Sequence, residues 1–149
     1  MKHILLAVDD SPAGLAAARA AITLAAQTSA QLRAIQVLAN GEVARELHER
    51  SETARTEERR ERGSTAVLKY VTGLAERAGV DIECMSLWGQ PARVILNQAT
   101  SWPADLIVLG RAGHRHVGQP YIGSDVRHVL EFTTVPVVVV PHAERAEHR

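Results

Sequence analysis

The chain has 149 residues, which fits one domain and leaves little room for two. Lysine plus arginine and aspartate plus glutamate number 17 each, so the formal net charge is zero, without the positive excess of a general nucleic-acid or membrane-surface binder. Apolar residues make up 46% of the chain and aromatic residues only 3%, so the core must be built from Ala, Val, Leu and Ile.

The first predicted elements are a strand, a helix and a second strand. Ile4–Val8 is short and apolar throughout, which is typical of a strand buried on both faces. Ser11 and Pro12 predict a helix start, because serine caps helices and proline has the right φ for the first helical position. An apolar face follows at helical spacing, formed by Leu15, Ala18, Ile22 and Ala25. Leu32–Leu38 is the second predicted strand, and Asn40 and Gly41 end it.

The middle of the chain changes composition twice. Glu42–Arg62 is dense in Glu and Arg, which favours a solvated helix or connection with side-chain ion pairs over an interaction surface. An apolar helical period then returns with Val67, Tyr70, Val71, Leu74, Ala75 and Ala78. Gly79 lies where a helix C-cap belongs.

The remaining elements continue the alternation. Val80–Trp88 places Val80, Ile82, Cys84 and Trp88 on one side and Asp81 and Glu83 on the other, as in a half-exposed edge strand. A helix follows from Gln90 and Pro91 with Val94, Ile95 and Ala99 on its apolar face, and Trp102 and Pro103 end it. The last elements are a buried strand, a helix, a strand and a polar tail, at Leu106–Leu109, Asp125–Phe132, Val135–Val140 and His142–Arg149.

Strands that alternate with helices predict a single α/β domain, in which a doubly wound parallel sheet has helices on both faces. We expect the domain to span residues 1–141 and the polar tail to span 142–149. No apolar run is long enough to cross a membrane, and the N-terminus has no signal-peptide pattern. The only cysteine, Cys84, offers no internal disulfide, so we expect a cytoplasmic protein.

Ligands of open α/β sheets bind outside the carboxyl ends of the strands. Three loops are predicted there, namely Asp9–Ser11, Leu38–Gly41 and Gly110–Ser124. In the third loop, Gly110 and Gly113 would leave backbone N–H groups open to an oxyanion. Gly123 and Ser124 open a helix whose N-terminus suits phosphate, although singly these residues are as well explained by turns and a serine cap.

The spacing G-x2-G-x9-G-[ST], met by Gly110, Gly113, Gly123 and Ser124, resembles the nucleotide loop of ATP-binding universal stress proteins. The opening ILLAVDDSP and the closing VPVVVVP also resemble that family, and the element order agrees nearly from end to end. The first strand has no GxGxxG after it and the chain has no GxxxxGK[ST], so neither a Rossmann dinucleotide site nor a P-loop is expected.

The resemblance implies a five-stranded sheet of order 3-2-1-4-5 and a homodimer through the last strand, Val135–Val140. A Val-rich edge strand is also a pairing hazard unless it is covered, which self-pairing about a two-fold axis would achieve. The resemblance further implies an ATP-like ligand, possible Mg²⁺, and a set of nucleotide-binding residues. These are Ala7, Val8 and Asp9 at adenine and ribose, Val37 at adenine, and Gly110, Arg111, Gly113, Gly123, Ser124 and Asp125 around ribose and phosphates.

Asp125 departs from the resemblance, because the family usually has a small apolar residue there. A carboxylate in the first helical turn is favoured by the helix dipole, but it repels a bound triphosphate. Arg111 and Arg115 could compensate for that repulsion. We therefore expect Asp125→Val to strengthen nucleotide binding.

Other candidate residues carry weaker signals. Asp9 and Asp10 could hold Mg²⁺, although we favour a ribose contact for Asp9. His114 and His116 lack a third metal ligand and are better explained by phosphate contact or exposure to solvent. We expect packing roles for Cys84, Trp88 and Trp102, and we explain Ser124 by capping and phosphate contact rather than by a pair with His128.

Three functions are consistent with these features. The first is a stress-response regulatory protein that binds an adenine nucleotide. The second is a slow Mg²⁺-dependent ATP hydrolase or self-phosphorylating protein with Ser124 as acceptor. The third is a dimeric scaffold that binds no nucleotide and acts through its dimer surface and Glu42–Arg62. No set of nucleophile, base and orienting group follows from the spacing, so no catalytic residue is predicted.

Overall fold

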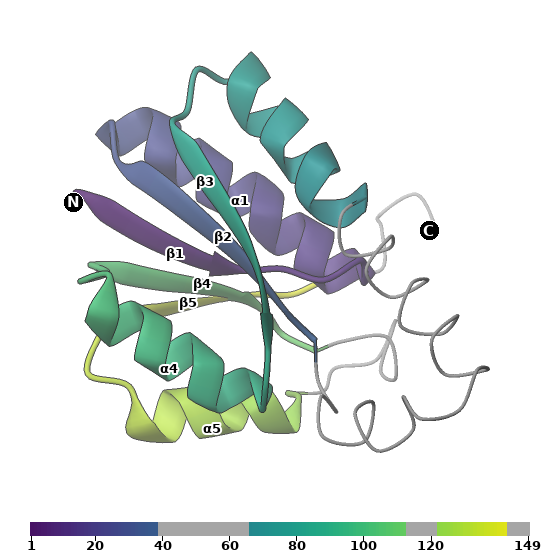
Figure 1. Cartoon of the computed structure of the whole chain (residues 1–149), viewed down its shortest axis with the longest axis vertical. Helices are drawn as coiled ribbons and strands as arrows, with labels where there is room; N and C mark the ends of the chain where they lie inside the picture. The colour runs from purple at the N-terminus through teal and green to yellow at the C-terminus, as the bar shows by residue number, and fades with distance from the viewer. Residues whose placement is uncertain (39–65, 113–121, 143–149) are drawn as a thin grey trace, which may run out of the picture.

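The computed structural model describes residues 1–38, 66–112 and 122–142. The predicted segment Glu42–Arg62, the loop residues Gly113–His116 and all but the first residue of the predicted tail lie outside these ranges. The described residues form a five-stranded parallel sheet with helices on both faces (Figure 1). The strand order is β3-β2-β1-β4-β5, which confirms the predicted order and the doubly wound α/β class.

The five strands lie close to their predicted positions and pair in parallel. Their bounds are β1 His3–Ala7, β2 Gln31–Leu38, β3 Ile82–Trp88, β4 Leu106–Gly110 and β5 Val137–Val140. The last strand begins at Val137, later than the predicted Val135, because Thr133 and Pro136 prevent regular strand pairing at Val135 and Pro136. The Thr133 hydroxyl bonds the backbone of Val135, and Pro136 has no N–H for a sheet ladder.

The central strands are buried on both faces, as their continuous apolar runs predict. In β1, Ile4 and Leu6 belong to one core cluster while Leu5, between them, belongs to the other. In β4 the same alternation places Val108 in the first cluster and Ile107 in the second. Each central strand therefore joins two apolar cores, one under each helical layer.

Helix α1 (Pro12–Thr28) and the helix that includes residues 66–77 cover one face of the sheet. Helices α4 (Pro91–Ser101) and α5 (Ser124–Phe132) cover the other face (Figure 1). The apolar period predicted from Val67 holds for Val67, Val71 and Ala75, which are buried. It is wrong for Tyr70, whose side chain is 47% exposed, and for Ala78, which lies exposed in the turn before Gly79. Gly79 has the positive φ of a helix C-cap, 70°, as predicted.

The edge strand β3 confirms one prediction and corrects two. It lies at the sheet edge, as expected. Glu83 is exposed on the second face, as predicted, but that face becomes apolar further along the strand, where Met85 and Leu87 pack against the core under α4. Cys84 packs against the other core. The sequence predicts a packing role for Trp88, but this residue ends the strand and is 42% exposed.

The amino ends of the strands are tied together by polar and aromatic contacts. The Asp105 carboxylate accepts hydrogen bonds from the backbone N–H groups of Lys2 (2.7 Å) and His3 (2.9 Å), which lower the pKa of Asp105 below its usual value. Trp102 stacks on His3 with ring centroids 4.4 Å apart, and the Arg33 guanidinium lies 4.7 Å from the Trp102 ring centroid. Trp102 thus has the packing role predicted for it, at the end of the sheet opposite to the carboxyl ends.

Candidate functional site

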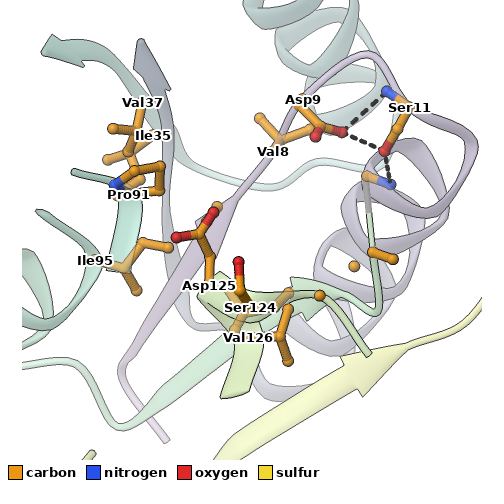
Figure 2. A pocket seen from close by; sticks show the side chains of 16 residues that line it. Val8, Asp9, Ser11, Ile35, Val37, Pro91, Ile95, Ser124, Asp125 and Val126 are labelled. Atoms are coloured by element: carbon orange, nitrogen blue, oxygen red, sulfur yellow. Dashed lines mark hydrogen bonds between the residues drawn. The ribbon is translucent and has the colours of Figure 1, made fainter. Parts of the chain in front are cut away.

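A cavity of about 470 Å³ opens at the carboxyl ends of β1, β2 and β4 (Figure 2). The amino-terminal ends of α1, α4 and α5 also reach it. This is the position at which doubly wound sheets bind ligands, beside the strand where the chain order reverses. The cavity is lined by Ala7, Val8, Asp9, Ser11, Gly14, Ile35, Val37, Pro91, Ile95, Leu109, Gly110, Ala112, Gly123, Ser124, Asp125 and Val126.

One wall of the cavity is apolar. Ile35 and Val37 project from β2, and Pro91 and Ile95 lie beside them at the start of α4 (Figure 2). Ile35 and Val37 are two residues apart, so their side chains emerge on the same face of the strand. A flat apolar ring that enters the cavity can be desolvated against this wall.

The first strand ends in a hydrogen-bonded turn that caps α1. Asp9 Oδ1 accepts hydrogen bonds from the Ser11 backbone N–H (2.9 Å) and from the Ser11 hydroxyl. The Ser11 Oγ in turn accepts one from the Gly14 N–H (3.0 Å), which confirms the predicted cap. Ser11 is 1% exposed, so the Asp9 Oδ1 has a structural role as the acceptor for this buried residue. Among the described residues the Asp9 Oδ2 has no hydrogen-bond partner, and it is the oxygen that a ligand can use.

The amino end of α5 has no side-chain cap. Gly123 is its N-cap residue, with φ −65° and ψ 157°, so the prediction that Ser124 caps this helix is wrong: Ser124 is the first helical residue. No acceptor for the N–H groups of Ser124, Asp125 or Val126 is found in the described parts of the chain. The side chains of Ser11 and Gln90 cap the other two helices at the cavity. The unpaired amides of α5 are therefore free to bind an anion.

The Asp125 carboxylate is attached to α4 through one side chain. Gln90 Nε2 donates a hydrogen bond to Asp125 Oδ1 (3.1 Å), while Gln90 Oε1 accepts one from the Arg93 backbone N–H (2.8 Å). Gln90 therefore caps α4 and holds Asp125 at the same time. Figure 2 shows the side chains of Asp125 and Ser124 pointing into the space between the apolar wall and the end of β1.

Gly110, which lines the cavity, is required by the approach of α1 to the sheet. A Cβ on Gly110 would lie 2.7 Å from the Ala13 carbonyl carbon and 2.9 Å from the Gly14 nitrogen. The missing Gly110 side chain thus makes room for α1, whereas the sequence had suggested room for an oxyanion. Gly123 differs, because a Cβ there would meet Ala112 Cα at 3.6 Å, an ordinary contact.

Most of the predicted site residues meet at this cavity. Those that line it are Ala7, Val8, Asp9, Val37, Gly110, Gly123, Ser124 and Asp125. Arg111 does not line it; its backbone N–H donates to Val140 O (2.8 Å) and its carbonyl accepts from Gly123 N–H (3.0 Å). Gly113, with Arg115 and the histidines 114 and 116, lies outside the described residues.

Several residues that line the cavity were not predicted from the sequence. Ile35 could have been found, because it shares a strand face with the predicted Val37. Pro91 and Ile95 carry a weaker signal, since they open a helix whose start meets the carboxyl ends of the strands. Gly14 carries no signal in the sequence, because its approach to Asp9 is a tertiary contact.

Two of the described residues that line the cavity have charged side chains, and both are acidic. They are Asp9 and Asp125, and no Lys, Arg or His side chain lines it among the described residues. In those parts of the chain no group of three or more metal-ligating side chains is found. His128 packs on the Phe132 ring with centroids 5.0 Å apart. Cys84 does not line the cavity and lies 3.2 Å from the Thr72 hydroxyl.

The fold and the cavity define a doubly wound α/β domain with an uncapped helix start beside an apolar wall. A model of the universal stress protein family matches residues 1–141. The chain is also 34% identical, over 139 residues, to universal stress protein MJ0531 of Methanocaldococcus jannaschii, a match that covers 93% of this chain and 81% of that protein. This chain therefore belongs to the universal stress protein family.

Solved structures share the fold. A protein called MJ0577 superposes with a TM-score of 0.82 at 18% identity, covering 97% of this chain and 98% of the other. A universal stress protein in complex with cAMP superposes with a TM-score of 0.70 at 22% identity, covering 95% and 98%. A family protein from Arabidopsis thaliana with AMP bound gives a TM-score of 0.66 at 15% identity, covering 99% and 95%.

No helix in the described parts of the chain is both long enough and apolar enough to span a membrane.

Proposed function

We propose that this chain is a stress-response regulatory protein that binds an adenine nucleotide in the cavity. The observation that supports this most is the uncapped start of α5, which faces the apolar wall across the cavity. Backbone amides at a helix start suit a phosphate, and an apolar wall suits a base. Two structures of the same fold, in complex with cAMP and with AMP, make an adenine ligand the first choice.

Each part of the nucleotide has a matching part of the cavity. The adenine ring would lie against Ile35 and Val37, the ribose hydroxyls near the Asp9 Oδ2, and a phosphate on the amides of Ser124 and Asp125. A Mg²⁺ ion carried in by the nucleotide would find a hard oxygen ligand in Asp9. ATP, the ligand that the sequence resemblance implies, is one member of this class.

The proposal is tested by following thermal unfolding during titration with AMP, ATP and ribose 5-phosphate. A nucleotide at one hundred times its Kd should stabilise the folded state by about 2.7 kcal/mol. Ribose 5-phosphate offers the phosphate without the base, so it should bind much more weakly than AMP. Absence of any stabilisation by adenine nucleotides, with no bound nucleotide in the freshly purified protein by mass spectrometry, would contradict the proposal and favour the scaffold function.

We also propose a homodimer through β5. This strand lies at the sheet edge and consists of four valines, and Phe132 just before it is 63% exposed. On the inner side of β5, the Pro136 carbonyl accepts a hydrogen bond from the Ile107 N–H in β4, and the Val140 carbonyl accepts one from the Arg111 N–H just after β4. Successive residues alternate in direction, so the backbone groups of Val137 and Val139 face outward, where a second copy could pair.

Val139→Pro is expected to weaken this dimer. Proline removes an outward N–H and is tolerated on edge strands, so the ladder to β4 should survive. Sedimentation over a concentration series should show the wild-type chain as a dimer and the variant as a monomer at the same concentration. A wild-type chain that stays monomeric at every concentration would contradict the proposed interface.

We further propose residues 1–141 as the nucleotide-binding domain, a range that agrees with the match to the family model. Residues 142–149 would form a polar tail. A cytoplasmic location agrees with the single cysteine, Cys84, which is free. Fractionation of cells that express the chain with a tag at its C-terminus would test the location.

A further inference from the structure

We propose that Asp125, held by Gln90 at the start of α5, makes the cavity select adenine ligands with at most one phosphate over ATP. This inference rests on the proposed function, because it concerns which adenine ligand the same cavity accepts. It follows from the position of the Asp125 carboxylate, from the way that Gln90 holds it, and from the charges that line the cavity.

The Asp125 carboxylate and the anion-accepting amides share one turn of helix. Asp125 is the second residue of α5, and its own N–H is among the unpaired groups at the helix start. A phosphate bound to these amides therefore lies close to a negative side chain. A helix N-terminus carries roughly half a positive charge, which offsets part of one phosphate but not the charge of a triphosphate.

The carboxylate is restrained from turning away. It accepts a hydrogen bond from Gln90 Nε2 at 3.1 Å, and the other end of the same amide group is bonded to the Arg93 N–H at 2.8 Å. Moving the Asp125 side chain out of the cavity would break this bond. Gln90 is thus a positioning residue for the negative charge.

The other described charges at the cavity do not relieve the repulsion. Asp9 is also acidic, and no basic side chain of the described residues lines the cavity. Two unit charges 4 Å apart in water interact by about 1 kcal/mol, and more in a partly desolvated site. This corresponds to about a fivefold change in affinity, so ATP should bind at least about fivefold more weakly than AMP.

The inference is tested by calorimetric titration with adenosine, AMP and ATP, at low salt and without Mg²⁺, for the wild type and for Asp125→Asn. Asparagine keeps the side-chain size and an oxygen that can accept from Gln90, so only the charge is removed. The wild type should bind AMP at least about fivefold more tightly than ATP. Asp125→Asn should strengthen ATP binding at least about fivefold and leave adenosine within about twofold.

Asp10→Asn is the matched control, because Asp10 is exposed and does not line the cavity, yet the net charge changes equally. It should leave the ratio of AMP to ATP affinity unchanged. Higher salt or added Mg²⁺ should narrow the wild-type ratio, since both reduce the repulsion.

Two results would overturn the inference, and only the second would also contradict the proposed nucleotide binding. If ATP binds the wild type as tightly as AMP and Asp125→Asn does not alter the ratio, the selectivity is wrong while the proposed nucleotide binding stands. If adenosine, AMP and ATP all fail to bind the wild type, the selectivity and the proposed function both fail.

Discussion

Gly14→Ala should destabilise the domain by about 3 kcal/mol, enough to threaten folding at moderate temperature. In the interior of a helix the same exchange normally stabilises by roughly 0.5–1 kcal/mol, so the sign is reversed here. The reason is the close approach of α1 to the end of β1. A Cβ on Gly14 would lie 2.2 Å from Asp9 Oδ1 and 2.7 Å from the Asp9 carbonyl oxygen, which is backbone and cannot turn aside. Denaturant titration measures the change.

Gly73→Ala is the matched control for this prediction. Gly73 lies within the helical residues 66–77, and the nearest atom to an added Cβ is the Arg77 Nη2 at 3.9 Å. This variant should gain roughly 0.5–1 kcal/mol, because alanine loses less conformational entropy than glycine when the helix forms. If Gly14→Ala stabilised the domain as Gly73→Ala is expected to do, intrinsic helix propensity would explain both results. The close contact between α1 and Asp9 would then not require glycine at position 14.

The close approach of α1 explains how the fold builds the cavity. Small residues on the buried face of α1, among them Ala17, Ala18 and Ala21, let the helix lie near the sheet. Gly14 and Gly110 then bring its first turn onto Asp9 and the end of β4. A larger residue at either glycine would therefore displace the cap of α1 and one side of the ligand site together.

The fold could be predicted from local patterns because each pattern had a local cause. The continuous apolar runs at Ile4–Val8 and Leu106–Leu109 identify strands buried on both faces, and the structure places them side by side. Ser11 before Pro12 identifies the start of α1, where the serine oxygen accepts from Gly14 N–H. Such signals depend on residues that are neighbours in the sequence, so they can be recognised without knowledge of the tertiary structure.

The site was harder to predict, because its details depend on residues far apart in the sequence. At Gly110 the sequence suggests space for an anion, but the backbone at Ala13 fills that space. For Ser124 the sequence suggests a helix cap, but Gly123 takes that position and leaves the amides unpaired. The bond from Gln90 to Asp125 joins two helices and has no signature in the sequence.

Ser124→Pro should weaken the binding of AMP by roughly tenfold or more while the domain remains folded. Proline is favoured at the first position of a helix, where its fixed φ is suitable and a missing N–H costs nothing. The helices α1 and α4 already begin with Pro12 and Pro91. The preceding residue must be extended before proline, and Gly123 is, with ψ 157°. A hydrogen bond to a charged group contributes roughly 1.5–3 kcal/mol, so the loss of one amide donor should be plain in a titration.

Two comparisons assign the loss to the backbone amide. Ser124→Ala removes the hydroxyl but keeps the N–H, so it should retain most of the affinity that Ser124→Pro loses. Adenosine has no phosphate and should bind the wild type and both variants alike, which would show that the apolar wall is intact.

If Ser124→Pro bound AMP as tightly as the wild type, the phosphate would not lie on the first amide of α5. If it lost adenosine as well, the proline would have altered the shape of the cavity, and the amides would not be the cause. Only a loss confined to the phosphate-bearing ligand identifies the open end of α5 as the anion site, because the base and ribose contacts are common to both molecules.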